Sequence, residues 1–393
     1  MRVALLTNIL TPYRLPVYQD LAATPGWTLR FMVGAEGDPS WQRAYAGAFE
    51  RGRKKLDVEV VRGLGLRRRT RVNAALDSSQ WVTLQLPLGA WGALARFEPD
   101  VVLSAELGPR SALASAWAAR SGAGLVLWSY LSRSQAAAAG PLRQRLRRAL
   151  LARADAVVGM GAQAREALRA LGVAEARLFD APNAHDVEGW QERLARVDAS
   201  AERAALRAGL GLRERVALAP MRLEASKGVG PLLRAWSALD RDVRGAWTLL
   251  FVGDGPERAA VENARAALGP GAVARLPALP PDDLARLYAA SDLLLFPSLG
   301  DPWGLVVNEA MAAGLPVLCS SLAGCADDLV VDGETGWRFD PTDAAGFRSA
   351  LERALGERDA HRLGERACAH VAAFTPARQA EGLRRAVRCA ARR

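Results

Sequence analysis

The chain has 393 residues, half of them hydrophobic, a composition that excludes a wholly disordered protein and predicts two domains with large cores. Its formal net charge of +10 is concentrated in residues 1–190, where 25 basic residues accompany 16 acidic ones. That basic half fits an acidic partner (anionic lipid, acidic glycan or nucleic acid), but it fits equally a chain that favours Arg, which supplies 49 of the 52 basic residues.

Strands and helices alternate through the first half of the chain. Strands are predicted at 3–8, 28–33, 57–61, 101–105, 125–130, 156–160 and 177–181, and helices at 12–23, 86–97, 110–120, 142–152 and 162–171. Residues 35–55 and the basic segment GLGLRRRTR (63–71) are expected to be loops. This alternation predicts a parallel sheet with helices on both faces.

The second half repeats the same pattern after residues 183–213, which lack strand character and are predicted to hold the interdomain linker. Strands are predicted at 216–221, 248–253, 273–276, 293–296 and 316–319, and helices at 229–239, 256–268, 282–289, 305–313 and 343–355. We expect domains at 1–185 and 186–375 and a final helix at 376–393. Because open α/β sheets bind ligands outside the carboxyl ends of their strands, a cleft between the two domains is the expected site.

The segment LLLFPSLGDPWGLVVNEAMAAGLPVLCS (293–320) carries the strongest functional pattern. A buried strand leads through a loop rich in Pro and Gly into a short helix, with the carboxylates of Asp301 and Glu309 eight positions apart. The backbone N–H groups of Gly304, Leu305 and Val306 are expected at the helix start, where they form an anion site. The segment therefore predicts a pocket for a phosphorylated ligand that also carries hydroxyl groups. By itself, Glu309 is equally well read as an exposed helix residue.

Two further segments follow predicted strands. APMRLEASKGV (219–229) contains Arg222 and Lys227, two cations that could neutralise a leaving diphosphate or could simply be a solvated pair. FVGDGPERAAVE (251–262) has Gly253 and Gly255 but lacks the third glycine of a dinucleotide fingerprint, so a tight turn is its simpler interpretation.

The segment PSLGDPWGLVVNEAMAAGLPV (297–317) resembles the signature of family 4 (group 1) glycosyltransferases of the GT-B fold, and the resemblance extends over nearly the whole chain. It implies an α/β fold of two Rossmann-like domains facing a central cleft. The first domain would bind the acceptor and the second a nucleotide sugar, and the C-terminal helix would cross back to the first domain.

The resemblance also implies roles for individual residues. Arg222 and Lys227 would contact the donor diphosphate, and Glu309 would bind the ribose hydroxyls. Asp301, where the family usually has Glu, would hold hydroxyls of the transferred sugar. The donor pocket would be completed by Gly253, Pro277, Gly304, Leu305 and Val306. The implied reaction uses a UDP- or GDP-linked sugar, retains the anomeric configuration, and needs neither a metal ion nor a cofactor.

The first domain departs from the family pattern, because TNILTPYRLP (7–16) lacks the glycine-rich loop and LVLWSYLSRSQ (125–135) lacks the usual His. The candidates for contact with the acceptor or the donor sugar are therefore Thr11, Tyr13, Arg14, Glu106, Trp128 and Arg133.

PLRQRLRRALLARAD (141–155) is a basic amphipathic segment. It predicts either a surface helix packed on the sheet or, through residues 141–153, a site that docks on an anionic membrane and would suit a lipid-linked acceptor. Two other functions are considered: a sugar-nucleotide epimerase of the same fold and a basic nucleic-acid-binding protein. Nucleic acid is not an expected partner, because aromatic residues are not interleaved with the Arg runs.

Four cysteines lack the spacing of a metal site, and Cys319 is expected in the core. MRVALLTN passes directly into a strand without a signal-peptide cleavage region, and no apolar run reaches the ~18 residues of a membrane span. The expected location is cytoplasmic, peripheral at the inner face of the plasma membrane.

Overall fold

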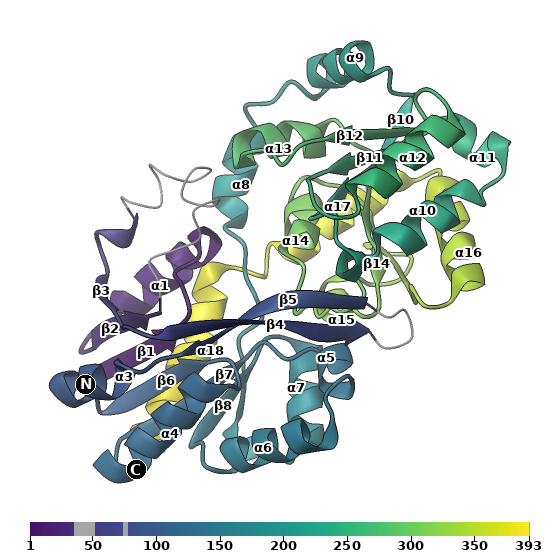
Figure 1. Ribbon diagram of the computed structural model, residues 1–393. Coiled ribbons are helices and arrows are strands. Elements are labelled where there is room, and N and C mark those ends of the chain that lie inside the picture. The colour runs from purple at the N-terminus through teal and green to yellow at the C-terminus, as the bar shows by residue number, and fades with distance from the viewer. Residues whose placement is uncertain (35–51, 74–77, 393) are drawn as a thin grey trace. The chain divides into compact units, whose positions relative to one another are not determined.

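The computed structural model describes residues 1–34, 52–73 and 78–392 (Figure 1). The chain forms two compact units. Unit 1 contains Met1–Thr70, Trp81–Asp186 and Phe374–Arg393, and unit 2 contains Arg71–Gln80 and Val187–Ala373. Each unit has its own parallel sheet, so the predicted α/β class with two Rossmann-like domains is confirmed.

The sheet of unit 1 has seven parallel strands in the order β3-β2-β1-β6-β7-β8-β9. Its strands are β1 (Arg2–Thr7), β2 (Thr28–Val33), β3 (Asp57–Val60), β6 (Val101–Ala105), β7 (Gly124–Ser129), β8 (Ala156–Gly159) and β9 (Leu178–Asp180). The inner strands β6, β7 and β8 are buried along their whole length, as expected for near-continuous apolar runs covered on both faces.

Helices cover both faces of this sheet and form two separate apolar clusters against it. They are η1 (Pro12–Arg14), α1 (Leu15–Ala22), α3 (Ala90–Phe97), α4 (Pro109–Ser121), α5 (Arg133–Ala137), α6 (Pro141–Ala152), α7 (Ala162–Ala170), η2 (Glu175–Arg177) and α18 (Pro376–Ala390). The C-terminal helix α18 packs on β7, β8 and β9 and against α1, so the last part of the chain belongs to the unit formed by the first part (Figure 1).

The sheet of unit 2 has six parallel strands in the order β12-β11-β10-β13-β14-β15. Its strands are β10 (Arg215–Pro220), β11 (Trp247–Val252), β12 (Val273–Leu276), β13 (Leu293–Phe296), β14 (Val317–Ser320) and β15 (Gly336–Phe339). Its helices are α8 (Val187–Leu194), α9 (Ala199–Leu210), η3 (Ala225–Lys227), α10 (Val229–Ser237), α11 (Arg241–Gly245), α12 (Arg258–Leu268), α13 (Pro281–Ala289), α14 (Leu305–Ala312), α15 (Ala326–Leu329), α16 (Ala344–Leu355) and α17 (Ala360–Val371).

The prediction that residues 63–71 form a basic loop is wrong. Residues 64–73 form a strand, β4 (Leu64–Asn73), which pairs with β5 (Ser78–Leu86) in a two-stranded sheet. Leu64 and Leu66, at the start of β4, are both exposed, so these apolar residues do not mark a buried strand face in the sequence. The predicted helix 86–97 is correspondingly too long, because β5 extends to Leu86 and α3 starts at Ala90.

Residues 183–213, expected to hold the interdomain linker, contain two helices of unit 2. Helix α8 packs on α13 and α14, and its Trp190 side chain is almost completely buried. Most of the predicted loop 35–55 lies outside the described residues. Among the helices of the described ranges, none has both the length and the apolar character needed to cross a bilayer.

Candidate active site

Three loops of unit 2 meet at the carboxyl ends of the neighbouring strands β11, β10 and β13. Glycines let their backbones touch: a Cβ on Gly253 would lie 2.0 Å from the Met221 carbonyl oxygen, and one on Gly228 would lie 2.0 Å from that of Pro297. The Leu299 N–H also donates to the Ser226 carbonyl at 2.9 Å. The predicted site residues of segments 219–229, 251–262 and 297–317 are therefore brought to one edge of one sheet.

Lys227 and Asp301 form an ion pair at this edge, in which Lys227 Nζ donates to Asp301 Oδ2. Their side chains are 19% and 15% exposed, so the pair is largely screened from water. The other carboxylate oxygen of Asp301 accepts the Trp303 N–H at 3.2 Å. Burial raises the pKa of Asp301, but the Lys227 ammonium, the Trp303 N–H and the charge of Arg222 together lower it below its usual value.

Helix α14 begins at Leu305, shortly after Asp301 in the sequence. Its first residue, Leu305, follows Gly304, whose φ of 111° lies in the left-handed region. A Cβ atom on Gly304 would also lie 2.5 Å from the Phe296 ring. Both the backbone conformation and the lack of space for a side chain therefore require glycine here. The N–H groups of Leu305 and Val306 lie in the first turn, where no carbonyl of the same helix can accept from them. The anion site expected at this helix start stays a prediction.

A fourth loop, residues 321–325 after β14, supports the loop that follows β13. The Gly324 N–H donates to the Asp301 carbonyl at 3.0 Å, and the Cys325 N–H donates to the Trp303 carbonyl at 3.2 Å. The buried Trp303 indole in turn donates to Asn308 Oδ1 of α14 at 2.8 Å. The loop that carries Asp301 is thus fixed both to its neighbour and to the helix that follows it.

The carboxylate of Glu309 is held by a residue that the sequence did not single out. Tyr288 of α13 donates its hydroxyl to Glu309 Oε2 at 3.0 Å. Trp190 of α8 packs edge-on against the Tyr288 ring at 5.7 Å and donates its indole N–H to the Glu309 carbonyl at 3.0 Å. No spacing rule links these three positions, which lie on three different helices.

Two remaining donor-side candidates lie at the same edge but are open to solvent. Arg222 has a side chain 67% exposed and an ion pair with Glu224 at 3.0 Å. Pro277 follows β12 and is exposed, and the Leu276 carbonyl before it accepts the Gly253 N–H at 3.0 Å. Both are available to a ligand.

In unit 1, Arg14 is the centre of an aromatic cluster. Its guanidinium carbon lies 5.4 Å, 5.0 Å and 4.3 Å from the ring centres of Tyr13, Trp128 and Tyr130. Arg14 also donates to the Tyr130 hydroxyl at 2.8 Å, and it is only 7% exposed. Thr11, at the start of this turn, is buried as well. Of these candidates, Tyr13 keeps a partly exposed side chain.

Trp128 requires a correction, because it is completely buried in the apolar core of unit 1. Its position on the inner strand β7 explains this burial, and a side chain in that position does not contact an acceptor or a donor sugar. Arg133 is exposed and makes two hydrogen bonds to Glu166, at 2.8 Å and 2.6 Å.

Glu106 follows β6 and has a φ of 69°, unusual for a residue other than glycine. Its exposed carboxylate accepts from Asn8 at 3.2 Å and 3.3 Å, and its carbonyl accepts from the Ser111 hydroxyl. An unusual backbone conformation held by surrounding hydrogen bonds is a feature of functional loops. This geometry keeps Glu106 among the acceptor-side candidates.

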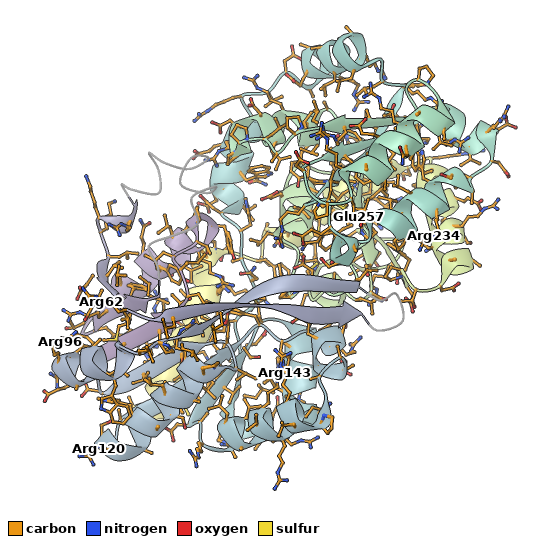
Figure 2. All side chains as sticks on the ribbon, viewed as in Figure 1. Arg62, Arg96, Arg120, Arg143, Arg234 and Glu257 are labelled. Carbon is orange, nitrogen blue, oxygen red and sulfur yellow. The ribbon has the colours of Figure 1, made fainter. Side chains whose placement is uncertain are left out.

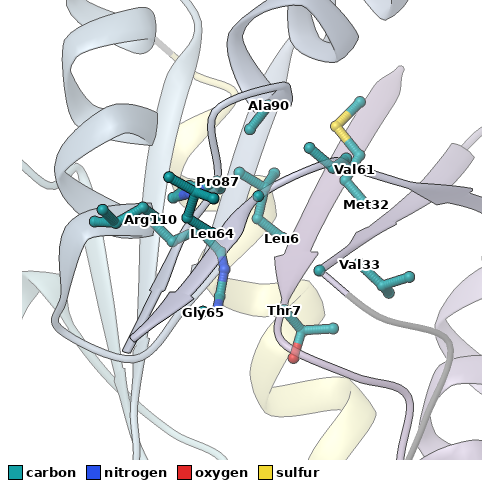
Figure 3. A pocket seen from close by; sticks show the side chains of 13 residues that line it. Leu6, Thr7, Met32, Val33, Val61, Leu64, Gly65, Pro87, Ala90 and Arg110 are labelled. Carbon is teal, nitrogen blue, oxygen red and sulfur yellow. The ribbon is translucent and has the colours of Figure 1, made fainter. Parts of the chain in front are cut away.

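A pocket of about 100 Å³ opens beside these residues in unit 1 (Figure 3). Its lining is apolar except for Thr7 and Arg110. Arg110 is buried and donates to the Ala105 carbonyl at 3.3 Å. Burial lowers the pKa of Arg110, although the nearby Glu106 opposes that shift. Sequence reasoning missed Arg110 because it lies inside a helix that otherwise looks ordinary.

The metal-free reaction expected from the sequence stays a prediction. Over the described parts of the chain, no group of three or more His, Cys, Asp or Glu side chains is arranged to hold a metal ion. The four cysteines are free thiols, and Cys319 and Cys325 are buried.

Two parallel-sheet units, one of which gathers a lysine–carboxylate pair before a helix start, define an α/β protein suited to an anionic ligand. A family model described as "Glycosyl transferases group 1" matches residues 203–370, and one described as "Glycosyl transferase 4-like domain" matches residues 21–184. The chain belongs to the family 4 (group 1) glycosyltransferases, and the resemblance found in the sequence is confirmed.

Curated relatives carry related names. A D-inositol 3-phosphate glycosyltransferase of Nocardia farcinica is 34% identical over 246 residues, which cover 60% of this chain and 52% of the relative. The sulfoquinovosyl transferase SQD2 of Arabidopsis thaliana is 34% identical over 117 residues, 29% of this chain and 22% of the relative. The chain thus spans about half the length, or less, of these relatives.

Solved structures share the fold. Anabaena Alr3699/HepE in complex with UDP and glucose superposes with a TM-score of 0.72 at 19% identity, covering 98% of both chains. The lipopolysaccharide outer core galactosyltransferase WaaB, in its apo form, gives 0.69 at 14% identity and covers 98% of this chain and 99% of WaaB. At these identities the similarity establishes the GT-B fold and nothing finer.

Proposed function

We propose that this chain is a glycosyltransferase that transfers a hexose from a UDP- or GDP-linked sugar to a glycan or lipid-linked acceptor. Its family membership supports the reaction class, and the structures of the Anabaena protein with UDP and with UDP-glucose support a nucleotide sugar as the donor. The observation that carries the proposal is the Lys227–Asp301 pair beside the first turn of α14.

In this proposal the leaving nucleotide diphosphate accumulates negative charge beside Lys227. The Lys227 ammonium has three donors, so it can keep its bond to Asp301 while also donating to a phosphate oxygen. The N–H groups of Gly304, Leu305 and Val306 would add further donors, and Arg222 could reach the diphosphate from the solvent side. Fixed positive charge of this kind stabilises a leaving group without the need for a general acid.

The two carboxylates are assigned different tasks. Asp301, kept ionised by Lys227, would accept hydrogen bonds from hydroxyls of the transferred hexose. Glu309, oriented by Tyr288, would accept from the ribose, while Gly253 and Pro277 would border the nucleotide. Transfer is proposed to retain the anomeric configuration by front-face attack, without a metal ion, as the family resemblance implies.

The acceptor is assigned to unit 1, where Tyr13, Glu106 and the pocket beside Arg110 offer aromatic, anionic and cationic contacts. The proposed pathways are the synthesis of polysaccharide, lipopolysaccharide or glycolipid. The proposed location is the cytoplasmic face of the plasma membrane, with residues 141–153 toward anionic lipid.

The proposal can be tested by a thermal-shift panel of UDP, GDP and their sugars, followed by a product assay with the donor that binds. We expect Lys227→Ala to lower kcat/KM by about 100-fold, a loss typical of one charge-stabilising group. Arg222→Ala should lower it as well, without risk to folding because Arg222 is exposed. Lys54→Ala, which removes an exposed lysine of unit 1, is the matched control and should transfer sugar normally.

Two results would overturn the proposal. One is unchanged turnover in both Lys227→Ala and Arg222→Ala. The other is an epimerised nucleotide sugar formed in the absence of any acceptor, which would assign the chain to the epimerases.

A further inference from the structure

Helix α6 of unit 1 has apolar side chains directed into solvent and a charged side chain directed inward. Leu142 and Leu146 are 71% and 63% exposed, whereas Arg147 is only 7% exposed. Leu151, buried at 1% exposure, and the partly buried Leu150 pack α6 against an apolar cluster of the unit. The two outer leucines therefore contribute little to the packing of α6.

The outward side chains form one continuous stripe. Leu142, Leu146, Ala149 and Arg153 follow the spacing i, i+4, i+7 and i+11, and Arg145 lies between the two leucines on the same face. All five residues are exposed. We call them the α6 stripe. Its apolar residues run from Leu142 to Ala149, with Arg145 between the two leucines and Arg153 at the C-terminal end.

The charged residues of α6 and of the segment that contains it are all of one sign. The sequence contains no acidic residue from 131 to 154, and α6 itself carries four arginines. In the described part of the chain no acidic side chain forms an ion pair with Arg145, Arg148 or Arg153. The remainder of unit 1 is also rich in exposed arginines, of which Arg62, Arg96 and Arg120 are labelled with Arg143 in Figure 2.

We propose that the α6 stripe docks unit 1 on an anionic lipid bilayer. Leu142 and Leu146 would enter the boundary between headgroups and acyl chains, while Arg145, Arg148 and Arg153 would bind lipid phosphates or carboxylates at the surface. A short helix with an apolar centre and basic flanks lies in the plane of such an interface.

The pattern of charged and apolar residues favours an anionic bilayer over a second copy of the chain and over a nucleic acid. A second copy of the chain, packed stripe to stripe, would bring arginines of the same sign together around the leucines. A nucleic acid would accept the arginines but would leave the two leucines at the centre of the contact without an apolar partner. An anionic bilayer satisfies both features, because it offers negative headgroups above an apolar layer.

This inference deepens the proposed function and rests on it for its purpose, since a lipid-linked acceptor would be met at the same membrane. The two can fail separately, because vesicle binding requires no sugar transfer and nucleotide binding requires no lipid.

The experiment is co-sedimentation of the full chain with phosphatidylcholine vesicles, prepared with and without phosphatidylglycerol. We expect binding only when phosphatidylglycerol is present, and weaker binding as salt is raised. The double variant Leu142→Gln/Leu146→Gln should lower the partition coefficient by about tenfold or more, because both apolar contacts are lost. Arg145→Gln/Arg148→Gln should lower it and reduce its dependence on salt.

Matched controls come from the same unit. Leu88→Gln removes a leucine that is 65% exposed but lies outside α6, and Arg120→Gln removes an exposed arginine at the end of α4. Both controls should bind vesicles like the unmodified chain, and UDP or GDP binding should be equal in all variants.

Failure of the unmodified chain to sediment with anionic vesicles would overturn the inference. So would wild-type binding by the leucine double variant, or a lipid-free dimer that this variant converts to a monomer. In the last case the stripe would be an interface between two copies of the chain.

Discussion

At the scale of single residues, the position of one carboxylate depends on two aromatic side chains that the chain supplies from elsewhere. Glu309 has its side chain fixed by the Tyr288 hydroxyl and its carbonyl by the Trp190 indole. Without these contacts, a partly exposed carboxylate such as that of Glu309 would sample several rotamers and would lose this freedom on binding a ligand. Tyr288 is thus a positioning residue for the proposed contact with ribose.

We therefore expect Tyr288→Phe to weaken binding of the donor nucleotide about fivefold, which corresponds to roughly 1 kcal/mol for one lost hydrogen bond. The ring that packs on Trp190 is kept, so the fold and kcat should be little changed while KM rises. Isothermal titration calorimetry with UDP or GDP measures the effect.

The matched control is Tyr18→Phe, which removes a buried hydroxyl from unit 1 and should leave nucleotide affinity as it is. Equal affinities in Tyr288→Phe and the unmodified protein would show that the Glu309 carboxylate needs no such support, or that it does not bind the nucleotide.

At the scale of elements, α6 combines its outward leucines with a buried arginine that is poorly compensated. Nε and Nη1 of Arg147 have no hydrogen-bond partner among the described residues. Burial lowers the pKa of Arg147 to about 10, and the neighbouring positive charge of Arg143 adds to this shift. Such a group costs free energy, because its hydration is lost without replacement.

Replacing this side chain by an apolar one of similar length should stabilise unit 1. We expect Arg147→Met to raise the free energy of unfolding by about 1–2 kcal/mol, as found when buried charges are replaced by well-packed apolar groups. Urea denaturation followed by circular dichroism provides the measurement. Arg148→Met, one position along and exposed, should stay within about 0.5 kcal/mol of the original. A loss of stability in Arg147→Met would mean that the guanidinium has a partner in solution.

The strands also show which parts of the fold could be predicted from the sequence. The buried parallel strands other than β15, which was not predicted, were found to within one or two residues, because their apolar runs are covered on both faces. The strand β4 was missed because Leu64 and Leu66 are exposed and the following arginines suggested a solvated loop. Where the apolar residues of a strand are exposed, no alternation of apolar and polar residues is required.

The candidate site could be predicted from the sequence only where its residues lie close together in the chain. Segment 297–317 carries Asp301, Gly304 and Glu309 within one loop and helix, and its family pattern was visible. Its ion pair with Lys227, its support from loop 321–325 and its contact with Tyr288 depend on which strands are neighbours. The strand order of the sheet cannot be deduced from the spacing of residues within one segment of the sequence.

At the scale of the whole molecule, the chain leaves unit 1 at Asp186, builds most of unit 2, and returns at Phe374. The returning helix α18 lies so close to the sheet that a Cβ on Gly382 would come within 2.1 Å of the Asp180 carbonyl oxygen. Ala380, Leu383, Ala386 and Val387 of the same helix are fully buried in a core cluster of unit 1. Residues of α18 therefore share one apolar core with residues of β1 and α1.

We expect Gly382→Ala to destabilise unit 1 by about 2 kcal/mol or more, since the helix must move away from a backbone atom that cannot yield. Gly209→Ala is the matched control: it is also a helical glycine, but nothing lies within 4 Å of the added methyl group. It should gain up to about 1 kcal/mol from helix propensity. Thermal unfolding of both variants distinguishes these outcomes, and equal stability would show that α18 is not held closely.

The return of α18 also bears on how the protein is made. A ribosome releases the chain from its N-terminus, and domains generally fold in the order in which they emerge. Here the segment Val187–Ala373 is complete before Phe374–Arg393 appears, so the main body of unit 2 can fold while unit 1 still lacks its last helix. Until then the apolar face that α18 will cover is exposed. We therefore expect unit 1 to finish folding after unit 2, and nascent chains stalled before residue 374 to be the ones that chaperones hold.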